Sequence, residues 1–315
     1  MTQAIATREA YGRELARLGE ARPDIVVLDA DLSGSTKTSI FAQQFPDRFF
    51  NMGIAESDMM GTAAGLATTG LVPFASTFAI FATGRAFEQI RNSIAYPQLP
   101  VVIAATHAGV TVGPDGGSHQ SVEDIALMRS LPGMTLLVPA DGVEAAQMVH
   151  AAAERGGPVY LRLGRSAVPI LPRPADYRYR LGQAELMADG DDVAIFACGI
   201  MVQQALEARE TLQEQNISAA VINVSTIKPI DVKAIVEAAR HTGCAVTAEE
   251  HSIIGGLGSA VAEVLAEHYP VPMERVGVND AFGESGPPAA LLEKYGLTAA
   301  HIVEKAVRAW RRKRS

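Results

Sequence analysis

A glycine-rich stretch near the middle of the chain, Gly113–Ser121 (GPDGGSHQS), carries side chains that could bind or transform a ligand. Asp115 and His119 lie within it, and His107 lies a few residues before it. The stretch has no lysine and lacks the GxxxxGK pattern, so it is not a phosphate-binding loop of the Walker type. A metal site is poorly supported, because the spacing of the three side chains has no HExxH-type helix behind it. A substrate-binding loop and an ordinary surface loop remain open.

A second group with possible chemistry is Glu56, which stands among apolar residues such as Met59 and Met60. A carboxylate at the start of a helix is favoured by the helix dipole, which would explain it structurally. In water-poor surroundings it could instead share a proton with a ligand nitrogen. Phe78 and Phe81 are similarly open, since aromatic residues at this spacing suit either a core or the faces of a flat ring.

The last dense polar cluster is EEHSIIGGLGS, Glu249–Ser259. Its glycines precede a predicted helix, but their spacing does not match GxGxxG, so a dinucleotide site has little support. The two cysteines, Cys198 and Cys244, show no metal-type spacing and lie in apolar surroundings. We therefore expect them to be buried, reduced thiols.

Short apolar runs alternate with segments of helical period, which predicts mostly parallel α/β sheets. Residues 57–70 are rich in small side chains and predict a tightly packed helix with Ser57 as its cap. A further helix is expected over 84–96. The strands expected in the first half cover residues 24–32, 49–56, 71–77, 100–106, 135–140 and 158–164.

A segment rich in proline and charge, residues 166–192, interrupts the alternation and suggests a linker. The alternation then resumes, with strands expected at 193–199, 218–229, 244–250 and 273–280. A length of 315 residues also favours two domains. We predict two consecutive three-layer α/β domains, residues 1–175 and 185–315.

Composition limits the class of protein. The formal net charge is −8, which argues against a general nucleic-acid-binding protein. No apolar run is long enough to span a membrane, and the start MTQAIATREAYGREL does not resemble a secretory signal. We expect a cytoplasmic protein that binds neither nucleic acid nor membrane.

In open α/β sheets, ligands bind at the carboxyl ends of the strands. In the first predicted domain these ends are followed by carboxylates, two histidines, two phenylalanines, hydroxyls and an arginine. So many polar groups at one edge exceed what a structural domain requires, and we expect a site there.

Several stretches together resemble the pyrimidine-binding and C-terminal domains of transketolases. They are GIAESDMMGTAAGLA, STFAIFATGRAFEQIRNSIAY, THAGVTVGPDGGSHQSVEDIALMRSLPGMTLLVPAD, VYLRLGR and TAEEHSIIGGLGSAVAEVL, in the order of the family. The diphosphate-binding domain of the family, with its GDG…N metal motif, is not in the sequence. The chain thus resembles the C-terminal half of a split transketolase.

The resemblance implies thiamine diphosphate as the cofactor. The family's glutamate, which hydrogen-bonds the aminopyrimidine ring, falls on Glu56, and Phe81 matches the aromatic residue that stacks on that ring, with Phe78 beside it. Asp31 matches a carboxylate near the cofactor and the dimer interface. A tyrosine of the family pattern is replaced by Gly84, which puts that wall of the ring pocket in doubt.

The resemblance also implies ketol transfer, in which the C2–C3 bond of a ketose breaks and the two-carbon unit passes to an aldose. Glu56, His107 and His119 would be the catalytic groups. Arg8, Ser35, His107 and Arg165 match the group that holds a sugar phosphate, and guanidinium groups suit a dianion. Asp115 and His119 match residues that contact the donor's hydroxyls and carbon chain.

A separate N-terminal subunit should hold the diphosphate and Mg²⁺, so no metal ligand is assigned to this chain, and an α2β2 heterotetramer is implied. Two other thiamine diphosphate enzymes remain as alternatives. The 1-deoxyxylulose-phosphate synthases usually have arginine where Phe81 and His107 stand, and the 2-oxo-acid dehydrogenase β subunits usually lack DGGSHQ. A non-catalytic interaction subunit and a metal hydrolase built on His107, Asp115 and His119 are the alternatives outside that class.

Overall fold

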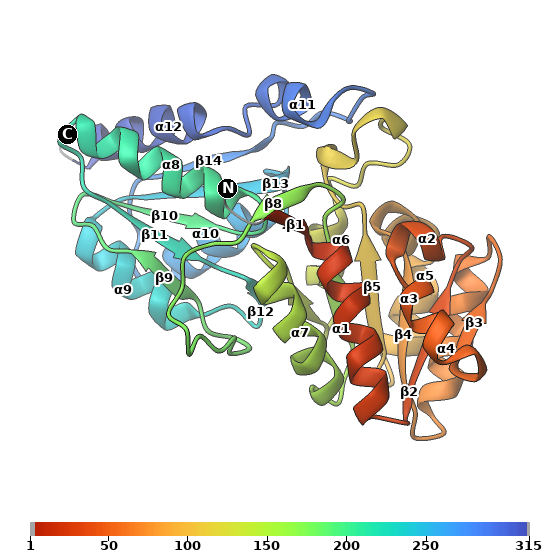
Figure 1. Ribbon diagram of the computed structural model, residues 1–315. Coiled ribbons are helices and arrows are strands. Elements are labelled where there is room, and N and C mark those ends of the chain that lie inside the picture. The colour runs from red at the N-terminus through yellow and green to blue at the C-terminus, as the bar shows by residue number, and fades with distance from the viewer. Residues whose placement is uncertain (1–3, 314–315) are drawn as a thin grey trace.

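The computed structural model describes residues 4–313, whose strands form two large sheets and one small one (Figure 1). The first large sheet has seven strands in the order β12-β6-β7-β5-β4-β2-β3. The second has five strands in the order β14-β13-β10-β11-β9, and β1 pairs with β8 in a two-stranded ribbon. Most neighbouring strands of the large sheets are parallel; β12 and β9 join antiparallel. The two α/β domains expected from the sequence are therefore present.

The strands are β1 Ala4–Ala6, β2 Ile25–Asp29, β3 Phe49–Asn51, β4 Val72–Phe78, β5 Val102–Thr106, β6 Thr135–Leu137, β7 Val159–Arg162, β8 Ala167–Pro169, β9 Glu185–Ala188, β10 Val193–Ala197, β11 Ala219–Asn223, β12 Thr226–Lys228, β13 Ala245–Ser252 and β14 Met273–Val278. The α-helices are α1 Thr7–Ala21, α2 Ser33–Thr36, α3 Ser39–Gln44, α4 Glu56–Ala67, α5 Phe87–Gln89, α6 Asp124–Ser130, α7 Gly142–Glu154, α8 Met201–Glu214, α9 Val232–Thr242, α10 Leu257–His268, α11 Pro288–Lys294 and α12 Ala299–Arg312. Shorter helical segments are η1 Pro46–Arg48, η2 Phe81–Arg85, η3 Ile90–Ala95 and η4 Val110–Asp115.

Both faces of the seven-stranded sheet are covered, which explains why its strands are nearly continuous apolar runs. Successive residues of β5 show this clearly. Val102 belongs to the cluster that contains Tyr11 of α1 and Met148 of α7, whereas Ile103 belongs to the cluster that contains Met59 of α4. The first domain thus has three layers, as expected from the sequence.

One predicted strand is wrong in a way that matters for the domain arrangement. Residues 218–229 were expected to form a single strand, but they form β11 in the five-stranded sheet and β12 in the seven-stranded sheet. β12 pairs antiparallel with β6, with Thr226 opposite Leu137. The second half of the chain therefore supplies an edge strand to the sheet of the first half, a long-range pairing that local periodicity cannot reveal.

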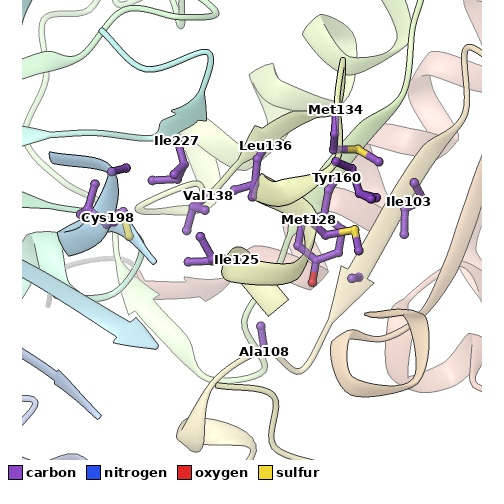
Figure 2. Close-up of a cluster of buried hydrophobic side chains, with 14 of the residues drawn as sticks. Ile103, Ala108, Ile125, Met128, Met134, Leu136, Val138, Tyr160, Cys198 and Ile227 are labelled. Carbon is purple, nitrogen blue, oxygen red and sulfur yellow. The ribbon is translucent and has the colours of Figure 1, made fainter. Parts of the chain in front are cut away.

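The apolar core is also continuous across the two halves. Figure 2 shows Ile103 and Leu136 of the first sheet in one cluster with Cys198 and Ile227 from the second half of the chain. Both cysteines are free and buried, as expected. Burial raises the pKa of the Cys244 thiol to about 11, which keeps it protonated.

Local structure differs from the prediction in three further places. β3 stops at Asn51, and α4 begins at Glu56 after Ala55, so Ser57 is not the cap. The predicted helix over 84–96 contains the π-helical segments η2 and η3. The predicted linker contains β8 and β9. Within residues 4–313, none of the helices combines the length and apolar character that a bilayer crossing requires.

Candidate active site at the strand ends of the first sheet

The register of the parallel strands brings the expected side chains to one edge of the sheet. Phe78, the last residue of β4, lies opposite Thr106, the last residue of β5. His107 follows at once with a left-handed φ of 57°, and Asp31 turns out of β2 with a φ of 63°. Because all these strands run in the same direction, the loops that follow them share one edge.

Four rings form the centre of this edge. Phe78 lies between two partners: its ring is stacked with Phe81 at a centroid distance of 5.8 Å and with His107 at 3.8 Å. His119 approaches Phe81 edge-on at 5.3 Å. The structure therefore brings together both phenylalanines and both histidines that the sequence predicted.

Glu56 adjoins this ring cluster through an arginine that sequence analysis did not identify. The Glu56 side chain is 1% exposed, and Arg85 Nη1 donates to its Oε2 at 2.8 Å. The Arg85 guanidinium also lies over the Phe81 ring, 4.8 Å from the centroid. Arg85 follows Gly84, where the family pattern has a tyrosine. This difference from the family pattern is the feature of the sequence that could have drawn attention to Arg85.

The hydrogen bonds of His107 define its tautomer. Arg8 Nη1 lies 3.3 Å from His107 Nε2, and since a guanidinium only donates, Nε2 must accept. The proton then belongs to Nδ1, which donates to Thr106 Oγ1 at 2.8 Å. Burial, followed by the charges of Arg8 and Arg165, lowers the pKa of His107 to about 3. His107 is thus a neutral imidazole at physiological pH, with its acceptor nitrogen directed to the cationic side of the site.

Positive charge is concentrated around His107. Burial and the nearby Arg165 lower the pKa of Arg8, so the two guanidiniums are close enough to repel each other. Lys37, which sequence analysis also missed, adds a third positive charge near His107. Glu9 offsets part of this charge, because Lys37 Nζ lies 3.5 Å from its carboxylate. A cluster of like charges in a half-buried site is unfavourable unless an anion binds there.

The glycine-rich stretch lies beside these cations. Arg165 Nη1 contacts Asp115 Oδ2 at 3.1 Å and also donates to the backbone oxygen of Val112. His119 Nδ1 lies 3.0 Å from Ser118 Oγ. The same His119 ring contacts Phe81 edge-on. Asp115 and His119 are partly exposed, so both can reach a ligand.

Two residues predicted to belong to the site, Ser35 and Asp31, do not contact it in the way expected. Ser35 lies next to Arg8, but the contact at 2.6 Å is made by its backbone oxygen and not by its hydroxyl. Asp31 is exposed and accepts a hydrogen bond from Asn51 at 3.0 Å; no contact joins it to the rings. Its expected place near a dimer interface remains a prediction.

The second polar cluster, around Glu249–His251, is buried and has internal partners. Glu249 accepts from the backbone N–H groups of Leu257 and Gly258 at the start of α10. A carboxylate of the chain itself therefore occupies the helix terminus where a dinucleotide phosphate would bind, which agrees with the poor fit of GGLGS to that motif. His251 accepts from the N–H of Ala126 through Nε2. Burial raises the pKa of Glu249 to about 7 and lowers the pKa of His251 to about 4.

A metal hydrolase finds no support. In the described part of the chain, no three histidine, cysteine, aspartate or glutamate side chains are grouped as metal ligands. His107, Asp115 and His119 instead contact a threonine, an arginine and a serine, respectively. This edge thus combines stacked aromatic rings with neighbouring guanidinium groups.

Comparison with known proteins agrees with this architecture. Residues 3–170 match the transketolase pyrimidine-binding domain, and residues 182–302 match the transketolase C-terminal domain. A putative transketolase C-terminal section from Methanocaldococcus jannaschii is 48% identical over 300 residues, which cover 95% of this chain and 94% of that protein. The 6-deoxy-6-sulfo-D-fructose transketolase subunit SqwH of Clostridium sp. is 44% identical over 299 residues, which cover 95% of this chain and 92% of that subunit.

A solved structure is also closely similar. A split-gene transketolase described as an inactive β4 tetramer superposes with a TM-score of 0.92 at 60% identity, covering 98% of this chain and 99% of that one. The chain therefore belongs to the transketolase family, whose members depend on thiamine diphosphate. It is a transketolase-type enzyme subunit that corresponds to the C-terminal section of a split transketolase.

Proposed function

We propose that this chain binds the pyrimidine ring of thiamine diphosphate and an anionic ketose, and transfers a two-carbon ketol unit together with a separate N-terminal subunit. The main observation in support of the proposal is that a possible ring-binding site and a possible anion-binding site lie next to each other at one edge of the sheet. A buried carboxylate beside a pair of stacked aromatic rings adjoins a cluster of guanidinium groups.

The residues present fit the cofactor's pyrimidine ring. Glu56 is a buried carboxylate, and since Arg85 uses only Oε2, Oε1 can hydrogen-bond a ring nitrogen and hold a proton there. Phe81 and Phe78 offer an aromatic surface for stacking. When bound, thiamine diphosphate supplies the carbon nucleophile that attacks the ketose carbonyl. Mg²⁺ and the diphosphate are assigned to the partner subunit.

The donor sugar is proposed to lie along the histidines and arginines. Arg8 and Arg165 bind the terminal anionic group by charge-assisted hydrogen bonds. His107, being neutral, can accept a hydrogen bond from a substrate hydroxyl through Nε2 if that hydroxyl takes the place of Arg8. Asp115 and His119 contact the donor's hydroxyls and carbon chain. These assignments support a phosphorylated or similarly anionic sugar, and a sulfonate would satisfy the same guanidinium groups.

The most direct test asks whether activity requires the separate N-terminal subunit. The chain should be purified alone and with the diphosphate-binding subunit, and ketose-phosphate cleavage followed with and without thiamine diphosphate and Mg²⁺. We expect no turnover from the chain alone and turnover from an α2β2 mixture. Full activity of the single chain, or none from the pair with any ketose donor, would contradict the proposal. The description of the similar β4 tetramer as inactive agrees with the first expectation.

The anion site is tested by comparing donors. A phosphorylated ketose and its unphosphorylated counterpart should differ in KM with the native pair, and Arg8→Met should remove most of that difference. Loss of a charge-assisted hydrogen bond corresponds to about a tenfold to hundredfold rise in KM for the phosphorylated donor. An equal effect on both donors would assign Arg8 to the fold and not to the anion.

A further inference from the structure

The loop that carries Asp115 and His119 is tied at its base. Gly109 N donates to the backbone oxygen of Ser121 at 2.8 Å, and Ala108 pairs with Ser121 in an isolated bridge. Residues 108–121 therefore leave the sheet and return to the same point. Such a loop needs support from outside itself if its tip is to hold a fixed position.

That support comes from the second domain. Glu250, on β13, is 4% exposed, and its Oε1 accepts from the backbone N–H of Thr111 at 2.7 Å. Gly109 lies against the same carboxyl group: a Cβ there would be 2.2 Å from the Glu250 carboxyl carbon, and its φ of 81° also favours glycine. Glu250 is thus in direct contact with the base of the loop.

Glu250 is itself held in place. Arg162 Nη2 donates to its backbone oxygen at 2.9 Å, and Nε and Nη2 of the same guanidinium also donate to the Asp124 carboxylate. The second domain also reaches the far part of the loop, because Ser285 Oγ donates to Pro114 O at 2.6 Å. Gln120 Nε2 donates both to Val110 O on the loop, at 3.1 Å, and to Glu284 O in the second domain, at 2.8 Å.

We propose that Glu250 is a positioning residue for the donor sugar, acting from the second domain through Thr111 to fix the loop that carries Asp115 and His119. The inference rests on the function proposed above, and it assigns the second domain a part in substrate binding. Glu250 does not touch the ligand, so its effect reaches the reaction only through the geometry of the loop.

A matched control lies next to Glu250 on the same strand. Glu249 is equally buried, and its pKa, like that of Glu250, is raised by burial to about 7. It too is a carboxylate that accepts backbone N–H bonds, but its partners belong to α10 and not to the loop. A general loss of stability would follow from substituting either glutamate, whereas a change in the position of the loop would follow only from substituting Glu250.

The experiment compares Glu250→Asp, Glu250→Gln and Glu249→Asp in the complex with the N-terminal subunit. Shortening Glu250 withdraws its oxygen from Thr111, so we expect Glu250→Asp to raise the donor KM about tenfold. Glu250→Gln keeps an acceptor of the same length and should restore most of the affinity. Glu249→Asp should lower the melting temperature and leave the donor KM within about twofold of the native value. Equal KM changes in the two aspartate variants would overturn the proposal.

Hydrogen exchange provides a second measurement that does not depend on turnover. In the isolated chain, amides of residues 108–121 should exchange about tenfold faster in Glu250→Asp than in the native chain, with no such change in Glu249→Asp. Unchanged loop exchange in Glu250→Asp would overturn the positioning role. If the native complex shows no ketol transfer but exchange responds as expected, the proposed function fails and the structural contact stands.

Discussion

The two large sheets each end in a dense polar cluster, and the clusters differ in how completely their polar groups find partners within the chain. At the edge of the first sheet, Arg8 and Arg165 repel each other, and the arginine that pairs with Glu56 is half-exposed. Around β13, Glu249 holds the start of α10 and His251 holds α6. Buried polar groups whose hydrogen bonds are made within the chain hold its elements together, whereas neighbouring like charges at an accessible edge indicate a binding site.

The largest effect is expected where the first cluster does chemistry. Glu56→Gln should reduce kcat of the reconstituted enzyme by about 10² to 10⁴-fold, because an amide cannot hold and return the proton. The melting temperature of the chain should change little. Glu249→Gln is the control from the second cluster, and it should lower stability and keep most of the turnover. Near-native turnover of Glu56→Gln would remove Glu56 from its proposed role.

Two arginine–aspartate pairs make the second comparison. Asp124 and Arg162 are buried and joined by two hydrogen bonds, so Asp124→Ala should lower the free energy of unfolding by about 3–5 kcal/mol. Asp115 is 36% exposed in its pair with Arg165, and Asp115→Ala should cost less than about 1 kcal/mol. Urea unfolding of both variants measures the difference. Similar values would mean that burial does not make the Asp124–Arg162 pair the more important one for stability.

The pH dependence of stability gives a third test. Burial raises the pKa of Glu249 from 4.5 to about 7, so between these values the native protein binds more protons than the unfolded chain. The stability that this group contributes is therefore present below pH 4.5 and is lost as the pH rises through 7. Relative to Glu249→Gln, the native chain should lose up to a few kcal/mol over this range. Unfolding curves at pH 5 and pH 8 measure this, and a constant difference between the two proteins would contradict it.

Two glycines give the last comparison. A Cβ at Gly84 would meet only Ile80 at 3.7 Å, so Gly84→Ala should raise stability by about 0.5–1 kcal/mol through the lower entropy of the unfolded chain. A Cβ at Gly256 would lie 2.0 Å from Glu249 Oε2, so Gly256→Ala should cost about 1–3 kcal/mol. Thermal melts of both variants check the opposite signs. A stabilising Gly256→Ala would show that the second cluster is less tightly packed than its distances indicate.

Much of the first cluster could be predicted from the sequence, because strand ends in a parallel sheet converge by geometry. Phe78, His107 and Arg165 each follow a recognisable apolar run. The contacts of Arg85 and Glu250 could not be predicted, since one depends on a π-helical turn and the other joins residues 139 positions apart. Periodicity reports which face of an element is apolar, but it does not report which distant group that face meets.

The pairing of β12 with β6 has a consequence for biosynthesis. β6 is an interior strand only because Thr226–Lys228 lies along its outer side. Until that segment has left the ribosome, the first sheet ends in a strand with unpaired backbone groups, which is a template for association with other chains. The pyrimidine-binding half is thus completed by a segment made after it, and a chain truncated at the boundary between the halves would lack the strand that covers this edge.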